Sequence, residues 1–179
     1  MTRAGGGNRR IDRILEATYL GDLPALSLDE LRAKRDECLA ERDHLSLLRR
    51  LVQGRAEILK AELESRGSSG DHGPLVDRLA QILGGDEHTR PPSRGEALRV
   101  GLPEEELLSA RRRVERLVAD AEISDPSALD DERLTSAVDL LLTEERGVSD
   151  TRADVMRVLD ALQDELKRRY KDDPTLALR

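Results

Sequence analysis

Apolar residues recur every seventh position along two long segments of the chain. The first segment carries Leu31, Cys38, Leu45, Val52 and Leu59, and the second carries Leu134, Leu141, Val148, Val155 and Leu162. A seven-residue apolar repeat is typical of helices that pack against each other as a coiled coil. The pattern therefore predicts two long helices with a shared apolar seam.

Local signals set the expected boundaries of these helices. Ser27 and Glu30 have capping-box spacing, and nothing breaks the first helix before Gly67. The second helix is expected over 127–171, because Ser127 follows Pro126 and Pro174 comes after the helix. About 60 residues separate the two helices, which is enough for them to fold back antiparallel.

The remaining segments are shorter or polar. We expect a flexible basic tail and lead-in over 1–26, loops over 68–126 with short helices at about 75–83 and 104–121, and a tail over 172–179. The predicted fold is all-α, an antiparallel two-helix coiled coil with additional short helices.

The two long segments also share a pattern of polar residues. At the single offset from Ser46 to Ser149, apolar and polar positions of the first helix fall on like positions of the second, so the helix is duplicated. The polar positions of the two copies are Arg42, Ser46, Arg49, Gln53 and Glu57, and Glu145, Ser149, Arg152, Met156 and Asp160. At 100° per residue, each set lies within an arc of about 80° over an axial length of roughly 22 Å. Each copy is one polar stripe along one helix.

Placing arginine beside an apolar seam is costly, because burial of a guanidinium without a partner destabilises the fold by several kcal/mol. One copy alone is most simply a surface charge pattern, whereas two copies at the same spacing favour a binding site. Arginine can donate a fork to guanine or phosphate, serine can donate to phosphate, and a carboxylate can accept from guanine N1 and N2. The stripes therefore suit a guanine nucleotide, and two of them suit a ligand with two-fold symmetry.

The composition and charge of the chain argue against several classes of function. The chain has 179 residues with a net charge of −7, which argues against non-specific DNA binding. It has no apolar run long enough for a membrane span and one cysteine, Cys38, so we expect a cytoplasmic protein. No histidine has metal-ligand spacing and no nucleophile is paired with a base, so we expect neither a metal site nor an enzyme.

The duplicated motif resembles that of a known family. A pattern E-x3-S-x2-R-x3-Q-x3-D, present twice on antiparallel helices, is similar to that of the RsiG anti-sigma factors of sporulating actinobacteria. The second copy matches at Glu145, Ser149, Arg152 and Asp160 and departs at Met156, where the family has glutamine. The first copy matches at Ser46, Arg49 and Gln53, departs at Arg42, where the family has glutamate, and has Glu57 for aspartate.

This resemblance implies a ligand-dependent switch. It implies that two cyclic di-GMP molecules bind as an intercalated dimer along the coiled coil, and that the loaded face holds a WhiG-type sporulation sigma factor. Transcription of late sporulation genes would be inhibited, with a monomeric chain binding the sigma factor 1:1. In that picture Arg49 and Arg152 would engage guanine or phosphate, Glu57 and Asp160 would accept from guanine donors, and the two serines would support the phosphates.

Two other functions are alternatives to this one. A structural coiled-coil adaptor would bind a protein partner without nucleotide, and its stripe would form only salt bridges. A small-nucleotide hydrolase is disfavoured, because no metal-carboxylate cluster or general base stands beside the stripe.

Overall fold

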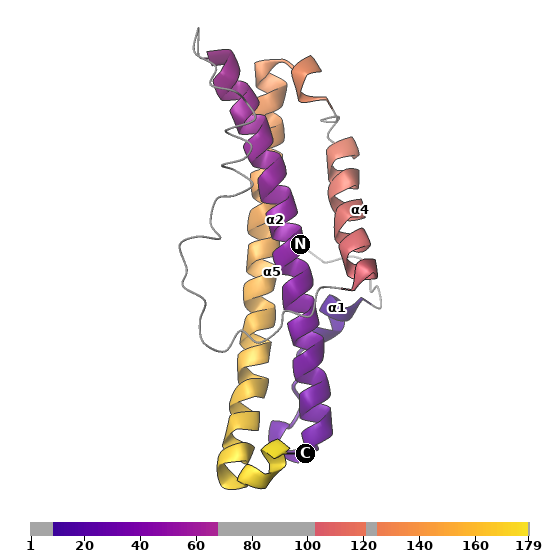
Figure 1. Cartoon of the computed structure of the whole chain (residues 1–179), viewed down its shortest axis with the longest axis vertical. Helices are drawn as coiled ribbons and strands as arrows, with labels where there is room; N and C mark the ends of the chain where they lie inside the picture. The colour runs from indigo at the N-terminus through magenta and orange to yellow at the C-terminus, as the bar shows by residue number, and fades with distance from the viewer. Residues whose placement is uncertain (1–8, 68–102, 121–124, 179) are drawn as a thin grey trace. The chain divides into compact units, whose positions relative to one another are not determined.

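A computed structural model describes residues 9–67, 103–120 and 125–178 of the chain. These residues form four α-helices and three short 3-10 turns, with no strand among them (Figure 1). The helices are α1 (Arg10–Ile14), α2 (Leu28–Gly67), α4 (Glu104–Asp120) and α5 (Asp131–Asp172). The 3-10 turns are η1 (Leu23–Ala25), η2 (Pro126–Ala128) and η3 (Pro174–Leu178). The prediction of an all-α fold with two long helices is confirmed, and the short helix expected at 75–83 lies outside the described residues.

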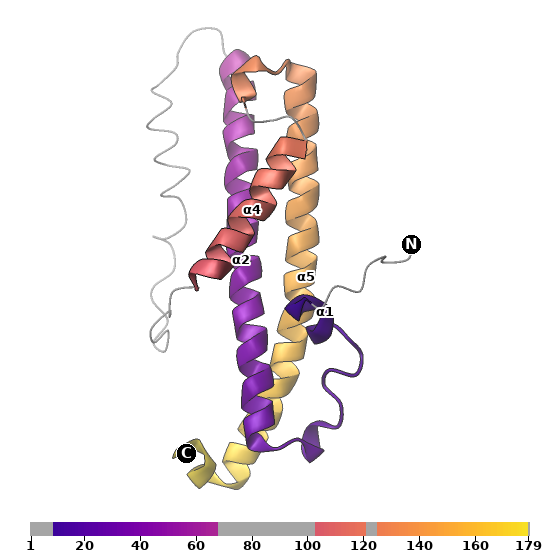
Figure 2. The ribbon, with the colours of Figure 1, turned by 90° about the vertical axis from the view of Figure 1, so that its right-hand side faces the viewer.

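The chain divides into two compact units, each of which contains part of α2 and part of α5. One unit comprises Met1–Ser46 with Ser149–Arg179, and the other comprises Leu47–Val148. We refer to them as the terminal unit and the middle unit. Within each unit the two long helices lie side by side and antiparallel, as predicted (Figures 1 and 2).

The terminal unit has its core along the predicted apolar seam. Its most deeply buried side chains come from α2, α5 and α1, and they include Leu31, Cys38, Val155, Leu162 and Ile14. Removing apolar surface of this kind from water is the main force that holds the helices together.

Residues 9–26 of the terminal unit form an ordered lead-in to α2, which contains the helix α1 and the turn η1. The α1 helix buries Ile14 completely and attaches to acidic residues of α2. Arg10 Nε donates to Glu41 Oε2 at 2.6 Å, and Arg13 forms an ion pair with Glu37. The apolar anchor and the two ion pairs together account for the ordered lead-in.

The middle unit adds α4 to the long helices, and α4 lies across α2 and α5 in Figure 2. The helix buries Ala110, Val114 and Val118. Arg113 Nη2 also donates to Glu144 Oε1 of α5 at 2.7 Å. Apolar spacing of three to four residues gives α4 its one packing face, which is the feature that the sequence predicts over 104–121.

The two long helices begin in different ways. The capping box at the start of α2 is present, since Ser27 N donates to Glu30 Oε2 at 2.7 Å and Glu30 N donates to Ser27 Oγ at 3.2 Å. The α5 helix begins at Asp131 rather than at Ser127. Asp125 accepts from Ser127 N at 3.0 Å, and Asp130 accepts from Arg133 N at 2.8 Å. Asp130 is therefore the helix cap, and the residues around Ser127 form the separate turn η2.

The duplication extends to tertiary contacts. Turns η1 and η2 occupy equivalent positions of the repeat, as do Arg66 and Arg169. In the middle unit Arg66 donates to Leu129 O at 2.6 Å and Pro126 O at 3.0 Å. In the terminal unit Arg169 donates to Leu23 O at 2.9 Å. Each long helix thus ends in an arginine that holds the turn preceding the other long helix.

Candidate functional site

The ten stripe residues are divided between the two units. The terminal unit holds Arg42, Ser46, Ser149, Arg152, Met156 and Asp160, and the middle unit holds Arg49, Gln53, Glu57 and Glu145. Each unit therefore contains residues of both copies of the motif.

In the terminal unit the two copies meet directly. Arg152 Nε of α5 donates to Ser46 Oγ of α2 at 2.9 Å, and Ser46 Oγ donates to Arg42 O at 2.7 Å. Arg42 directs its guanidinium away from these groups, because its Nε and Nη2 both donate to Asp43 Oδ1, at 2.9 and 2.7 Å. The hydrogen bonds place Arg152 within one helical turn of Arg42.

In the middle unit the two copies of the motif meet through an ion pair. Arg49 Nη1 lies 3.2 Å from Glu145 Oε1, with side chains 41% and 21% exposed. Gln53 is exposed and Glu57 is half-buried. Neither is hydrogen-bonded to the Arg49 and Glu145 pair within the described residues. The pair combines a guanidinium donor with a carboxylate acceptor at one partly accessible point.

The difference between the two meeting points follows from one substitution in the repeat. Arg49 and Arg152 occupy equivalent positions, so the repeat would pair Arg152 with residue 42 just as it pairs Arg49 with Glu145. Residue 42 is an arginine, which has no acceptor atom. Arg152 therefore uses the Ser46 hydroxyl instead.

Met156 and Asp160 continue the terminal-unit stripe along α5 beyond Arg152. Met156 is half-buried, and Asp160 is exposed. The structure does not bring either of them into hydrogen bonding with Arg42 or Ser46 within the described residues.

The α1 helix leaves the terminal-unit stripe uncovered. Its partner Glu41 on α2 lies about 140° around the helix from Ser46, so α1 attaches well away from the stripe. The stripe residues Arg42, Ser46 and Arg152 are half-buried, which leaves them reachable from solvent.

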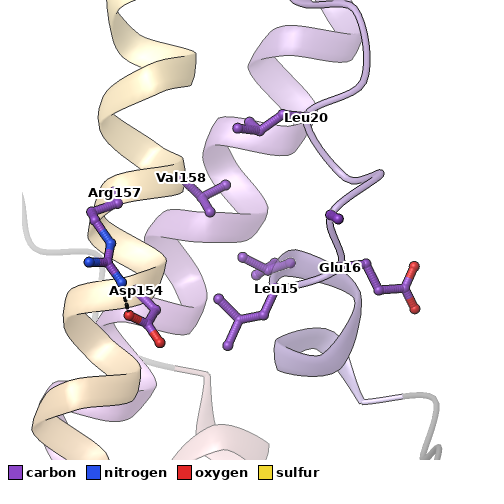
Figure 3. A pocket seen from close by; sticks show the side chains of 8 residues that line it. Leu15, Glu16, Leu20, Asp154, Arg157 and Val158 are labelled. Atoms are coloured by element: carbon purple, nitrogen blue, oxygen red, sulfur yellow. Dashed lines mark hydrogen bonds and ion pairs between the residues drawn. The ribbon is translucent and has the colours of Figure 1, made fainter.

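A separate hollow of about 430 Å³ lies between the α1 segment and α5 in the terminal unit (Figure 3). Leu15, Glu16 and Leu20 line it from the N-terminal segment, and Arg157 and Val158 line it from α5. No stripe residue lines this hollow. It is distinct from the candidate site.

Sequence reasoning missed one contact of the stripe, the pair of Arg42 with Asp43. Adjacent residues on a helix point about 100° apart, so helical spacing gives no reason to pair Arg42 with Asp43. The long arginine side chain nevertheless reaches the carboxylate.

The remaining candidates for chemistry are the single cysteine and possible metal ligands. Cys38 is fully buried, and burial raises the pKa of its thiol, which suits a packing residue rather than a nucleophile. Among the described residues, no group of three or more histidine, cysteine, aspartate and glutamate side chains could hold a metal ion.

Comparison with known proteins identifies a family that part of the chain resembles. The RsiG-like family model matches residues 17–83, which include the whole first copy of the stripe. A search of curated proteins finds no significant match. None of the described helices combines the length and apolar character needed to cross a membrane. The family match confirms the resemblance to the RsiG family over residues 17–83.

Proposed function

We propose that this protein is an anti-sigma factor controlled by cyclic di-GMP. Two ligand molecules, bound as an intercalated dimer through the stripe residues, would enable the chain to sequester a WhiG-type sporulation sigma factor and so inhibit late sporulation genes. One observation carries the proposal. The duplicated stripe places Arg152 against Ser46 in the terminal unit and Arg49 against Glu145 in the middle unit.

The stripe residues offer the groups that a cyclic guanine dinucleotide requires. Arg42 and Arg152 can each donate a planar fork to a phosphate or to guanine O6 and N7. Ser46 and Ser149 can donate to phosphate oxygens. Glu57, Glu145 and Asp160 can accept from guanine N1 and N2, as neutral apolar residues could not.

The bonds among the stripe residues are weak enough for a ligand to replace. Arg49 and Glu145 form a partly exposed ion pair, a kind that contributes about 1 kcal/mol or less. Arg152 is a charged donor to a neutral serine hydroxyl, and such a hydrogen bond is worth roughly 1.5–3 kcal/mol. Loss of both bonds would cost roughly 2–4 kcal/mol, and charged hydrogen bonds from the same two arginines to ligand phosphates would offset it.

The regulatory consequence follows from linkage. If the loaded face contributes to sigma-factor docking, the ligand raises affinity for the sigma factor, and the sigma factor raises affinity for the ligand by the same factor. This mechanism requires binding alone, with no reaction catalysed by the protein.

Substitution of Arg152 by lysine tests the proposal against the adaptor alternative. Lysine keeps the positive charge and can reach Ser46, but it cannot form a planar fork. We expect Arg152→Lys to bind cyclic di-GMP at least about tenfold more weakly in isothermal titration, with helicity by circular dichroism unchanged.

Arg157→Lys is the matched control, because Arg157 lies on the same helix, is 77% exposed and stands outside the stripe. It should bind the ligand like the wild type. If Arg152→Lys also bound like the wild type, the fork would have no role. Absence of cyclic di-GMP binding by the wild-type protein would instead favour the adaptor, in which the stripe forms only salt bridges.

A further inference from the structure

The repeat departs from symmetry at two consecutive heptad positions of α2, and both departures introduce arginine. Arg42 corresponds to Glu145, and Arg35, seven residues earlier, corresponds to Val138. Val138 is buried in the core of the middle unit with 7% of its surface exposed. Arg35 occupies the equivalent position of the terminal unit, where 30% of its side chain is exposed.

The helical phase places Arg35 on the stripe. Seven residues rotate an α-helix by about 700°, so Arg35 lies about 20° from Arg42 and roughly 10.5 Å along the axis. Arg49 lies about 20° from Arg42 in the opposite direction, so Arg35 falls within the 80° arc of the stripe. The first-copy stripe therefore extends two turns toward the N-terminus of α2.

Arg35 is held only loosely. Its guanidinium contacts Asp36, the next residue along the helix, with Nη2 2.7 Å from Oδ1. Asp36 is 61% exposed, so solvent screens the pair and its contribution is small. Arg42 makes the same kind of contact with Asp43. Both arginines can leave their neighbours at little cost and turn to an anion.

An arginine at a seam position destabilises the packing of the helices, whereas the valine at the equivalent position of the repeat does not. Partial burial removes water from the guanidinium, and a hydrogen bond to a single exposed carboxylate compensates for little of that loss. Departures from local packing rules of this kind are expected at functional sites. Among the stripe residues themselves, leaving aside Asp36 and Asp43, the balance of charge is consistent with this role. The extended stripe of the terminal unit has three arginines with Asp160, whereas that of the middle unit has Arg49 with Glu57 and Glu145.

We infer that Arg35 is an additional anion-binding residue, which acts with Arg42 and Arg152 to hold phosphate groups of the cyclic dinucleotide. The terminal unit is then the stronger phosphate-binding part of the stripe. This inference rests on the proposed function and names a residue outside the duplicated motif.

The substitution Arg35→Val tests this role, because it installs the residue that the repeat itself uses at position 138. Valine suits an apolar seam, so the melting temperature should be unchanged or higher. Loss of a charged hydrogen bond to phosphate should weaken cyclic di-GMP binding about tenfold or more in isothermal titration. Arg35→Lys, which keeps the charge, should recover part of the affinity.

Arg55→Val is the control, since Arg55 is an exposed arginine of α2 about 140° around the helix from Arg42. It should leave ligand affinity unchanged. Wild-type affinity in Arg35→Val would overturn the role of Arg35 and leave the proposed function standing. Absence of binding by the wild-type protein, with or without the sigma factor, would overturn both.

Discussion

The Arg169 contact with turn η1 predicts a measurable loss of stability on substitution. Arg169 Nη2 donates to Leu23 O at 2.9 Å and Pro24 O at 3.1 Å, and only 17% of its side chain is exposed. A hydrogen bond from a charged donor contributes roughly 1.5 to 3 kcal/mol when its partner is buried. Both carbonyl groups lie near the surface and regain water in the variant. We therefore expect Arg169→Ala to lower the free energy of unfolding by about 2 kcal/mol.

This loss corresponds to a fall in melting temperature of roughly 4–8 °C for a chain of this length. Thermal and urea unfolding followed by circular dichroism at 222 nm would measure it. Arg168→Ala is the matched control, because Arg168 also binds Glu165 but is 55% exposed and is not among the residues that hold η1. Equal losses in the two variants would show that the η1 contact contributes nothing and that Glu165 alone accounts for both.

Two further predictions concern acidity and the symmetry of the repeat. Hydrogen bonds from Arg168 and Arg169 lower the pKa of Glu165 from 4.5 to about 2, so its ionised form stabilises the fold above pH 4.5 and that stability is lost as pH falls toward 2. Glu165→Gln should flatten the stability profile between pH 5 and 2, and an unchanged acid transition by urea unfolding would contradict this. Arg42→Glu gives Arg152 a carboxylate acceptor, so a double-mutant cycle with Arg152→Ala should show a favourable coupling of about 0.5 kcal/mol, and zero coupling would refute the pairing.

The features that the sequence predicts well are periodic ones. Apolar residues at heptad spacing locate both long helices, because each residue of the seam repeats the same local signal. The start of α2 was also predictable, since the capping box of Ser27 and Glu30 is local. The sequence predicts the start of α5 at Ser127 because Pro126 precedes it, whereas the cap is Asp130. Several aspartate and serine residues there compete for the same role.

Features that depend on contacts distant in sequence were not predictable. The five residues of α1 are too few to show a period, and their order depends on Glu37 and Glu41 of α2. The contact of Arg169 with the η1 turn joins residues far apart in the chain, and no local pattern indicates it.

For the candidate site, too, local patterns in the sequence were predictable and contacts between distant residues were not. The stripe residues were found by spacing within each helix. Their mutual contacts required the antiparallel arrangement of α2 and α5. The bond of Arg152 to Ser46 follows from the arginine at position 42, and no local pattern indicates that acceptor rather than another. The functions of Gln53, Glu57, Met156 and Asp160 stay predictions.

Isothermal titration of the wild-type protein with cyclic di-GMP tests the central claim most directly. GTP and cyclic di-AMP serve as ligand controls, and the titration is repeated in the presence of a WhiG-type sigma factor. The account predicts selective binding of about two ligands per chain, with higher affinity when the sigma factor is present. No binding heat in either setting, with the protein folded by circular dichroism, would contradict the account and leave the duplicated stripe as a feature of helix packing.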